Sequence, residues 1–278
     1  MTEPAAAPTP HLAALGPFCA FETHPEGSEL TPPWRTLSEL TEEGNGALRE
    51  RVASVRASLA ANYGSPPEAV ESRAAASVAH LGLMARVISP ALGLATLHGL
   101  PSRPLTLGDL RWRSSLSGAF PLSLPREAVT PAAAEDVQHG YDPGSDTRPV
   151  SALADDLLTG PVHDLVATFA PFSVSQHILW GNVASAVNGA ATGITAAAPS
   201  LAHPAHATAL TFLQHPRLRN THTLNPHNAR FTRRSCCLIY RAAPGGTGAV
   251  CGDCVLLRGS GGGGRVGDGR GRRGRGGR

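Results

Sequence analysis

Apolar residues recur at helical spacing over much of this chain. Between residues 45 and 62 they are spaced by four, three and four positions, with arginines in between: Leu48, Val52, Val55 and Leu59. This period predicts an amphipathic helix. Residues 68–88 repeat the pattern, and Pro90 is expected to end or kink that second helix. Further helices are predicted at 151–159, 161–170 and 174–190.

Other parts of the chain show shorter apolar runs that are typical of strands. Residues 110–113 and 120–124 alternate weakly and predict two short strands. Residues 199–235 are crowded with His, Arg and Asn and are expected to form loops. Apolar runs at 238–240 and 255–257, separated by a Pro/Gly-rich turn, predict a hairpin. The expected fold class is α+β: a predominantly helical domain with a small sheet or hairpin that carries a C-terminal cysteine cluster.

Composition divides the chain into three parts. Residues 1–30 are rich in Ala, Pro and Thr without a period, and we expect a loose N-terminal lead-in. Residues 31–257 are expected to form one domain, with the cysteines in a subregion at 233–257. Residues 258–278 are Gly/Arg repeats with almost nothing to bury, which predicts a disordered tail.

Charge and hydropathy narrow the class of protein. The chain has no lysine. Seven arginines and one aspartate give residues 258–278 a net charge of +6. Since the whole chain has a net charge of +3, residues 1–257 carry a net charge of −3. The most apolar stretch, 81–100, contains Arg86 and Pro90, so we expect a buried helix and no transmembrane segment. The N-terminus lacks a basic start followed by an apolar core, so we expect no secretory signal and a cytoplasmic protein.

Four of the five cysteines lie within 19 residues: Cys236, Cys237, Cys251 and Cys254. A cytosolic chain keeps its thiols reduced, so this cluster favours a metal site over disulfides. The Cys-Gly-Asp-Cys segment has the spacing of a metal knuckle, in which a tight turn directs both sulfurs to one side. Zinc and iron–sulfur sites both use this spacing.

The adjacent pair Cys236-Cys237 helps to distinguish a zinc site from an iron–sulfur site. Neighbouring side chains of a regular strand point to opposite faces, so both can reach one centre only if the backbone bends or the centre is wide. A two-iron cluster is wider than one zinc ion, which favours 2Fe-2S. A structural Cys₄ zinc site remains the alternative to a 2Fe-2S cluster. Cys19 stands alone, and we take it for a bystander.

The cysteine segment resembles a known family. Residues 233–241, Arg-Arg-Ser-Cys-Cys-Leu-Ile-Tyr-Arg, and residues 251–256, Cys-Gly-Asp-Cys-Val-Leu, are similar to the C-terminal signature of the siderophore ferric-iron reductases of FhuF type. The segments 179–185 and 73–92 also resemble that family, so the resemblance extends over residues 30–257. The spacer between the cysteine pairs is thirteen residues here, where about ten are expected in the family. The extra residues fall in the turn, where insertions are tolerated.

The resemblance implies that Cys236, Cys237, Cys251 and Cys254 hold a 2Fe-2S cluster. It implies an enzyme, a ferric-siderophore reductase, that reduces Fe(III) in an imported siderophore, a hydroxamate by expectation, and releases Fe(II) in the cytoplasm. A donor such as a ferredoxin or a flavin reductase would supply the electron. Arg233 and Arg234 abut the first cysteine pair and are expected to line the approach of substrate or donor.

Two other functions remain open from the sequence. The first is a structural Cys₄ zinc protein whose basic tail binds a polyanion. The second is a siderophore-binding relative without redox turnover. We do not expect nucleic acid as the partner, because Gly/Arg repeats are also common as low-complexity extensions.

Overall fold

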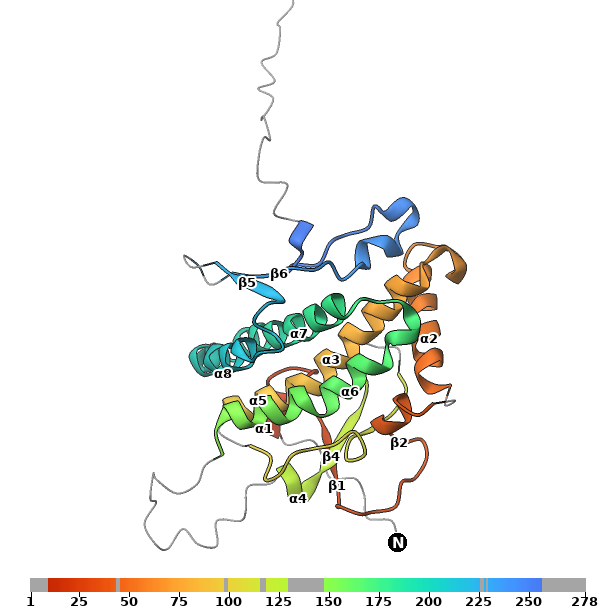
Figure 1. The fold of residues 1–278 in the computed structure, drawn as a ribbon. Coiled ribbons are helices and arrows are strands. Elements are labelled where there is room, and N and C mark those ends of the chain that lie inside the picture. The colour runs from red at the N-terminus through yellow and green to blue at the C-terminus, as the bar shows by residue number, and fades with distance from the viewer. Residues whose placement is uncertain are drawn as a thin grey trace, which may run out of the picture.

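The computed structural model describes residues 10–43, 46–97, 100–115, 119–129, 148–225, 228 and 230–256. Helices dominate it (Figure 1). The long α3 (Ser72–Thr96) lies at the centre and packs against α2 (Ala47–Ala61), α7 (Gln176–Ala197) and α8 (Ala202–Gln214). The remaining α-helices are α1 (Pro10–Ala13), α4 (Arg126–Val129), α5 (Val150–Thr159) and α6 (Pro161–Thr168). The short 3₁₀ turns are η1 (Leu37–Leu40), η2 (Pro67–Ala69), η4 (Ala170–Phe172), η5 (Pro199–Leu201), η6 (Ile239–Ala242) and η7 (Pro244–Gly246).

The central helix α3 is a core helix, as the sequence predicted. It is the one helix among the described residues that is long and apolar enough to cross a membrane, and 72% of its most apolar window is buried inside the protein. Arg86 lies in the middle of this helix and is buried. Its guanidinium donates to the carbonyl oxygens of Phe18 and Phe120, each at 2.7 Å, and to that of Ala20. A buried cation is thus satisfied by three carbonyls rather than by a carboxylate.

The sequence predicted that Pro90 ends or kinks this helix, and the prediction of an end at Pro90 is wrong. Pro90 lies inside α3, which continues to Thr96. Proline removes one helical hydrogen bond and costs about 3 kcal/mol in a helix interior. The buried apolar residues on both sides of it, such as Ile88 and Leu92, compensate because each is fully removed from water.

A four-stranded sheet lies below α3, α5 and α6 in Figure 1, with the short α4 beside it, and its strand order is β1-β4-β3-β2. β1 (Glu22–His24) is parallel to β4 (Leu122–Pro125), while β3 (Arg111–Trp112) is antiparallel to both β4 and β2 (Arg35–Thr36). The two strands predicted at 110–113 and 120–124 are therefore confirmed. Residues 10–24, which we placed in a loose lead-in, instead pack into the fold: β1 joins the sheet, and Leu12, Leu15 and Phe21 are buried.

The C-terminal half differs from the prediction in two places. Helix α8 lies within the segment that we expected to be loops. Its histidines and early proline hide an apolar face, formed by Ala205, Ala209, Phe212 and Leu213, that is buried in the core. The residues predicted as the first strand of a hairpin begin the 3₁₀ turn η6 instead.

The C-terminal hairpin comes before the cysteines, not around them. β5 (His222–Leu224) and β6 (Phe231–Arg233) are antiparallel, and Cys236 follows three residues after β6. Within residues 234–256 no strand occurs. The α+β fold class is confirmed. The predicted Gly/Arg tail at 258–278 lies outside the described residues.

Candidate metal centre

The fold brings the two cysteine motifs together at one edge of the molecule. The segment that carries them crosses the outer side of α7 and reaches the N-terminal end of α3 (Figure 1). The Sγ atoms of Cys237 and Cys251 lie 3.5 Å apart, and the thiols of Cys236 and Cys254 also interact. Each pair therefore takes one cysteine from each motif. Cys237 and Cys254 are buried, whereas Cys236 and Cys251 are partly exposed.

The backbone bends immediately after the adjacent pair. Leu238 has a φ of 67°, which is unusual for a residue with a side chain, and the chain then enters η6. The bend directs the Leu238 N–H to Cys236 Sγ, at 3.3 Å. The chain therefore leaves the extended conformation directly after the pair, and a backbone bend is one of the two ways in which neighbouring cysteines can serve one centre.

The second motif forms the expected tight turn. The Cys254 N–H donates to the Cys251 carbonyl at 3.1 Å, and the Leu256 N–H donates to Cys254 Sγ at 3.4 Å. Each motif thus supplies a backbone N–H to a sulfur, an arrangement that stabilises thiolates.

Asp253, inside this turn, anchors the second motif to the rest of the protein. Its carboxylate accepts hydrogen bonds from Ser185 Oγ at 2.9 Å and from Asn188 Nδ2 at 3.5 Å, both on α7. Its carbonyl accepts the Arg233 N–H at 3.0 Å, which ties the turn to β6. Burial raises the pKa of Asp253. Sequence reasoning did not assign Asp253 a role, although its position between two cysteines was visible.

Small residues on α7 provide the surface on which the first motif lies. Gly181 faces Ser235, whose Oγ donates to the His177 carbonyl at 3.1 Å. A Cβ at Gly181 would lie only 2.3 Å from Ser235 Oγ. Gly181, Ser185 and Gly189 are four positions apart on α7, a spacing typical of close helix packing, but Gly181 and Ser185 contact the cysteine segment.

The two arginines that precede the cysteines occupy different environments. Arg233 is 1% exposed and lies beneath the cysteine segment, where its Nη2 donates to Asn182 Oδ1 at 2.6 Å and to the Ile178 carbonyl at 3.2 Å. Arg234 is exposed, and its backbone N–H donates to the Thr221 carbonyl at 2.8 Å. A position on the approach to the cysteines therefore suits Arg234, whereas the burial of Arg233 withdraws it from any substrate.

Three more arginines that precede the cysteines in the sequence are exposed: Arg217, Arg219 and Arg230. Arg217 lies over the Trp180 ring, 5.2 Å from its centroid, and Arg230 acts electrostatically on Asp253. We call these three and Arg234 the basic rim; of the four, Arg230 acts on Asp253 of the second motif and Arg234 lies two residues before Cys236. None of the four takes part in an ion pair within the described residues. Their charge is thus available to a partner.

The thiols influence one another's protonation. The hydrogen bond that Cys237 and Cys251 share lowers the pKa of Cys237 to about 6 and raises the pKa of Cys251. Burial raises the pKa of Cys236. Cys19 is a core residue beside Gly93 of α3. Burial raises the pKa of its thiol to about 11, so the thiol stays protonated.

The comparison with protein families adds the decisive observation. Residues 233–256 match the FhuF 2Fe-2S C-terminal domain. The FhuF match contains all four cysteines of the centre, together with Arg233 and Arg234. It does not extend to the helices, so the likeness of residues 73–92 and 179–185 to the family stays a prediction. Neither the curated proteins nor the solved structures yielded a match.

The donors present fit the cofactor of a FhuF-type domain, which is a 2Fe-2S cluster. Four thiols meet as two pairs, and two guanidinium nitrogens of buried Arg233 have no hydrogen-bond partner in the part of the chain that the structure describes. Throughout the described residues, no three His, Cys, Asp or Glu side chains converge as the ligands of one metal ion would. The match to a 2Fe-2S domain favours a two-iron centre over a Cys₄ zinc site.

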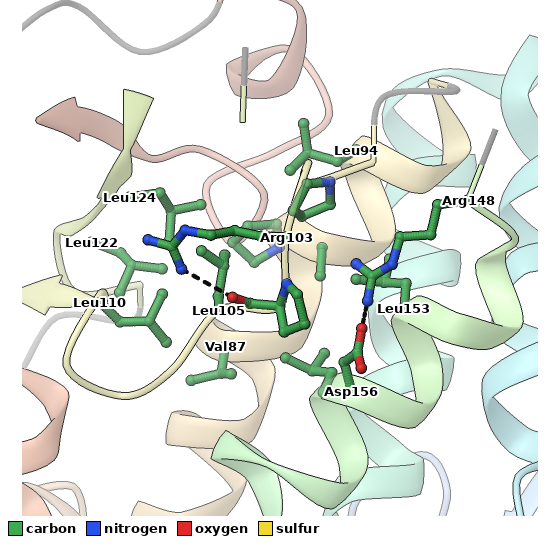
Figure 2. A pocket seen from close by; sticks show the side chains of 15 residues that line it. Val87, Leu94, Arg103, Leu105, Leu110, Leu122, Leu124, Arg148, Leu153 and Asp156 are labelled. Atoms are coloured by element: carbon green, nitrogen blue, oxygen red, sulfur yellow. Dashed lines mark hydrogen bonds and ion pairs between the residues drawn. The ribbon is translucent and has the colours of Figure 1, made fainter. Parts of the chain in front are cut away.

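A small cavity lies beside the C-terminal half of α3, away from the cysteines (Figure 2). Leucine is the commonest residue in its lining, and the Arg148–Asp156 ion pair lies on one side. Its volume of about 30 Å³ has room for about one water molecule. It is therefore too small to hold a siderophore.

Proposed function

We propose that this protein is a ferric-siderophore reductase, with a hydroxamate siderophore as substrate. The FhuF match indicates a siderophore-iron reductase-type protein. The observation that carries the proposal is that the matched cysteines meet as two pairs, one cysteine from each motif, at a partly exposed edge. An electron carrier in that position can meet a large chelate without an enclosed pocket.

In this proposal Cys236, Cys237, Cys251 and Cys254 are the cluster ligands. When bound, a 2Fe-2S cluster supplies one electron at a time. The chain's own part is to hold the four thiolates, to direct backbone N–H groups at two of them, and to keep Cys237 and Cys254 away from water. Asp253 and Gly181 fix both motifs on α7.

The substrate chemistry needs one electron and no catalytic acid or nucleophile. Hydroxamates are hard oxygen ligands that prefer Fe(III) to Fe(II). One electron converts the bound Fe(III) to Fe(II), which the siderophore then releases in the cytoplasm. A donor such as a ferredoxin or a flavin reductase loses one electron for each iron reduced, so the charges balance.

The first test is an anaerobic purification followed by visible and EPR spectra before and after dithionite. The expected protein is red-brown, EPR-silent as isolated, and gives one S = 1/2 signal when reduced. Ferric hydroxamate turnover with a reductant is then measured through capture of Fe(II) by a chromogenic chelator. A colourless protein that contains zinc contradicts the cluster, and a cluster-bearing protein without turnover supports a siderophore-binding relative instead.

The basic rim predicts how the electron donor is attracted. Replacing Arg230 and Arg234 with glutamine is expected to lower the rate of cluster reduction by an acidic donor several-fold at low salt, because opposite charge steers association. Arg49→Gln is the control, since Arg49 is exposed on α2. Stopped-flow reduction at increasing ionic strength measures the effect. Rates that do not depend on salt, and are equal in all three proteins, would contradict this role.

A further inference from the structure

Among the residues that the structure describes, Arg233 is a buried cation without a carboxylate partner. It is 1% exposed, and no ion pair within the described residues includes it. Asp253 lies within electrostatic range, but Ser185 and Asn188 hold its carboxylate. Burial lowers the pKa of neighbouring His80 to about 3, with Arg233 adding to the effect, so His80 is neutral. Buried charges are normally paired, so the missing anion needs an explanation.

Within the described ranges, only one end of the guanidinium has hydrogen-bond partners. Nη2 donates to Asn182 Oδ1 and to the Ile178 carbonyl. Nε and Nη1 are buried and have no partner among the described residues. Unsatisfied buried donors are rare and point to a group that binds there.

The guanidinium is held in place by the two central helices. Asn182 is fully buried, and its Nδ2 donates to the Ser77 carbonyl at 2.9 Å and to Ser77 Oγ at 3.2 Å. These bonds fix the amide so that its Oδ1 accepts from Arg233. Gly181 leaves room for the guanidinium, since a Cβ there would lie 3.1 Å from Nη2. The arrangement is therefore a built site rather than a chance contact.

The charge of Arg233 reaches the cysteines. It acts electrostatically on both Cys237 and Cys251, the pair whose sulfurs lie 3.5 Å apart. Two ferric ions, two sulfides and four thiolates together form an anion, and one added electron makes it more negative. A fixed cation beside it favours the reduced form, and charge and hydrogen bonds to sulfur are what set cluster potentials.

We propose that Arg233 is the buried counter-cation of the cluster, with Nε and Nη1 available to its sulfur acceptors, and that it raises the reduction potential. This inference rests on the proposed cluster, not on the identity of the substrate. Arg233 is thus a positioning and tuning residue that touches neither siderophore nor donor.

The test is the midpoint potential, measured by anaerobic redox titration of wild type and variants. Arg233→Gln is expected to shift the equilibrium toward the oxidised form by tenfold or more, which for a one-electron couple is a fall of about 59 mV or more. Arg233→Lys keeps the charge and is expected to lie between Arg233→Gln and wild type. Arg234→Gln, which removes an equal but exposed charge next in the chain, is expected to shift the potential far less.

A second variant keeps the proposal testable if Arg233→Gln fails to hold a cluster. Asn182→Asp leaves Arg233 in place and sets a carboxylate against its Nη2, so it too is expected to lower the potential. An unchanged potential in either cluster-bearing variant overturns the proposal, as does an equal shift in Arg234→Gln. A wild-type protein without a 2Fe-2S spectrum would instead overturn the proposed function.

Discussion

Replacing Cys237 with serine is expected to remove the cluster and to reduce ferric-siderophore turnover by more than about 100-fold, because even the outer partners of metal ligands contribute 10- to 100-fold to affinity. Cys237 is the buried member of the pair with Cys251, and its Sγ lies 3.5 Å from that partner. Serine offers a hard oxygen of much higher pKa in place of a thiolate, so one iron loses a ligand that suits it. Iron and acid-labile sulfide content, with the visible spectrum, measure the loss.

The fifth cysteine provides the control for this substitution. Cys19 is buried near α3, and nothing places it with the other four. Cys19→Ala is therefore expected to retain the cluster and the turnover, apart from a modest loss of stability for a smaller core side chain. A Cys237→Ser protein that kept both its cluster and its turnover would contradict the ligand assignment.

Replacing Gly181 with alanine is expected to displace the first cysteine motif from α7. The new Cβ would lie 2.3 Å from Ser235 Oγ and 3.1 Å from Arg233 Nη2. Such overpacking costs about 1–3 kcal/mol, and Ser235 lies directly before Cys236. We expect a lower unfolding free energy in urea and a faster loss of the cluster to a chelator.

Gly189 on the same helix is the matched control. A Cβ there meets nothing within 4 Å, and alanine favours a helix over glycine by about 1 kcal/mol. Gly189→Ala is therefore expected to be as stable as wild type or more so. In the Gly181→Ala background, Ser235→Ala removes the shortest contact and should restore part of the loss. Equal behaviour of the two alanine variants would show that the cysteine motif does not depend on Gly181.

The sequence predicts the elements whose signals are local. The cysteine spacing predicted a cluster-binding segment that the family match also covers, and the period of α2 was clear because its apolar residues alternate with arginines. Helix α8 was missed because its histidines and Pro204 conceal four apolar residues at helical spacing. The course of α3 through Pro90 depends on burial against neighbours, which local propensity does not contain.

The sequence could not predict that Arg233 is buried while Arg234 is exposed. Neighbouring residues at the end of a strand point to opposite sides, so one of the two had to turn inward. Which one did so depends on Asn182, 51 positions earlier in the chain, and on Ser77, still farther away. A long-range hydrogen bond of this kind leaves no period or motif.

The partial exposure of Cys236 and Cys251 has a consequence for substrate range. If the proposed cluster forms there, its outer edge meets solvent, and an electron leaves without crossing a layer of protein. Transfer then depends on brief surface contact with a chelate and little on the shape of its organic backbone. A reductase built in this way would tolerate several siderophores, and selection among them would fall to whatever brings each one into the cell.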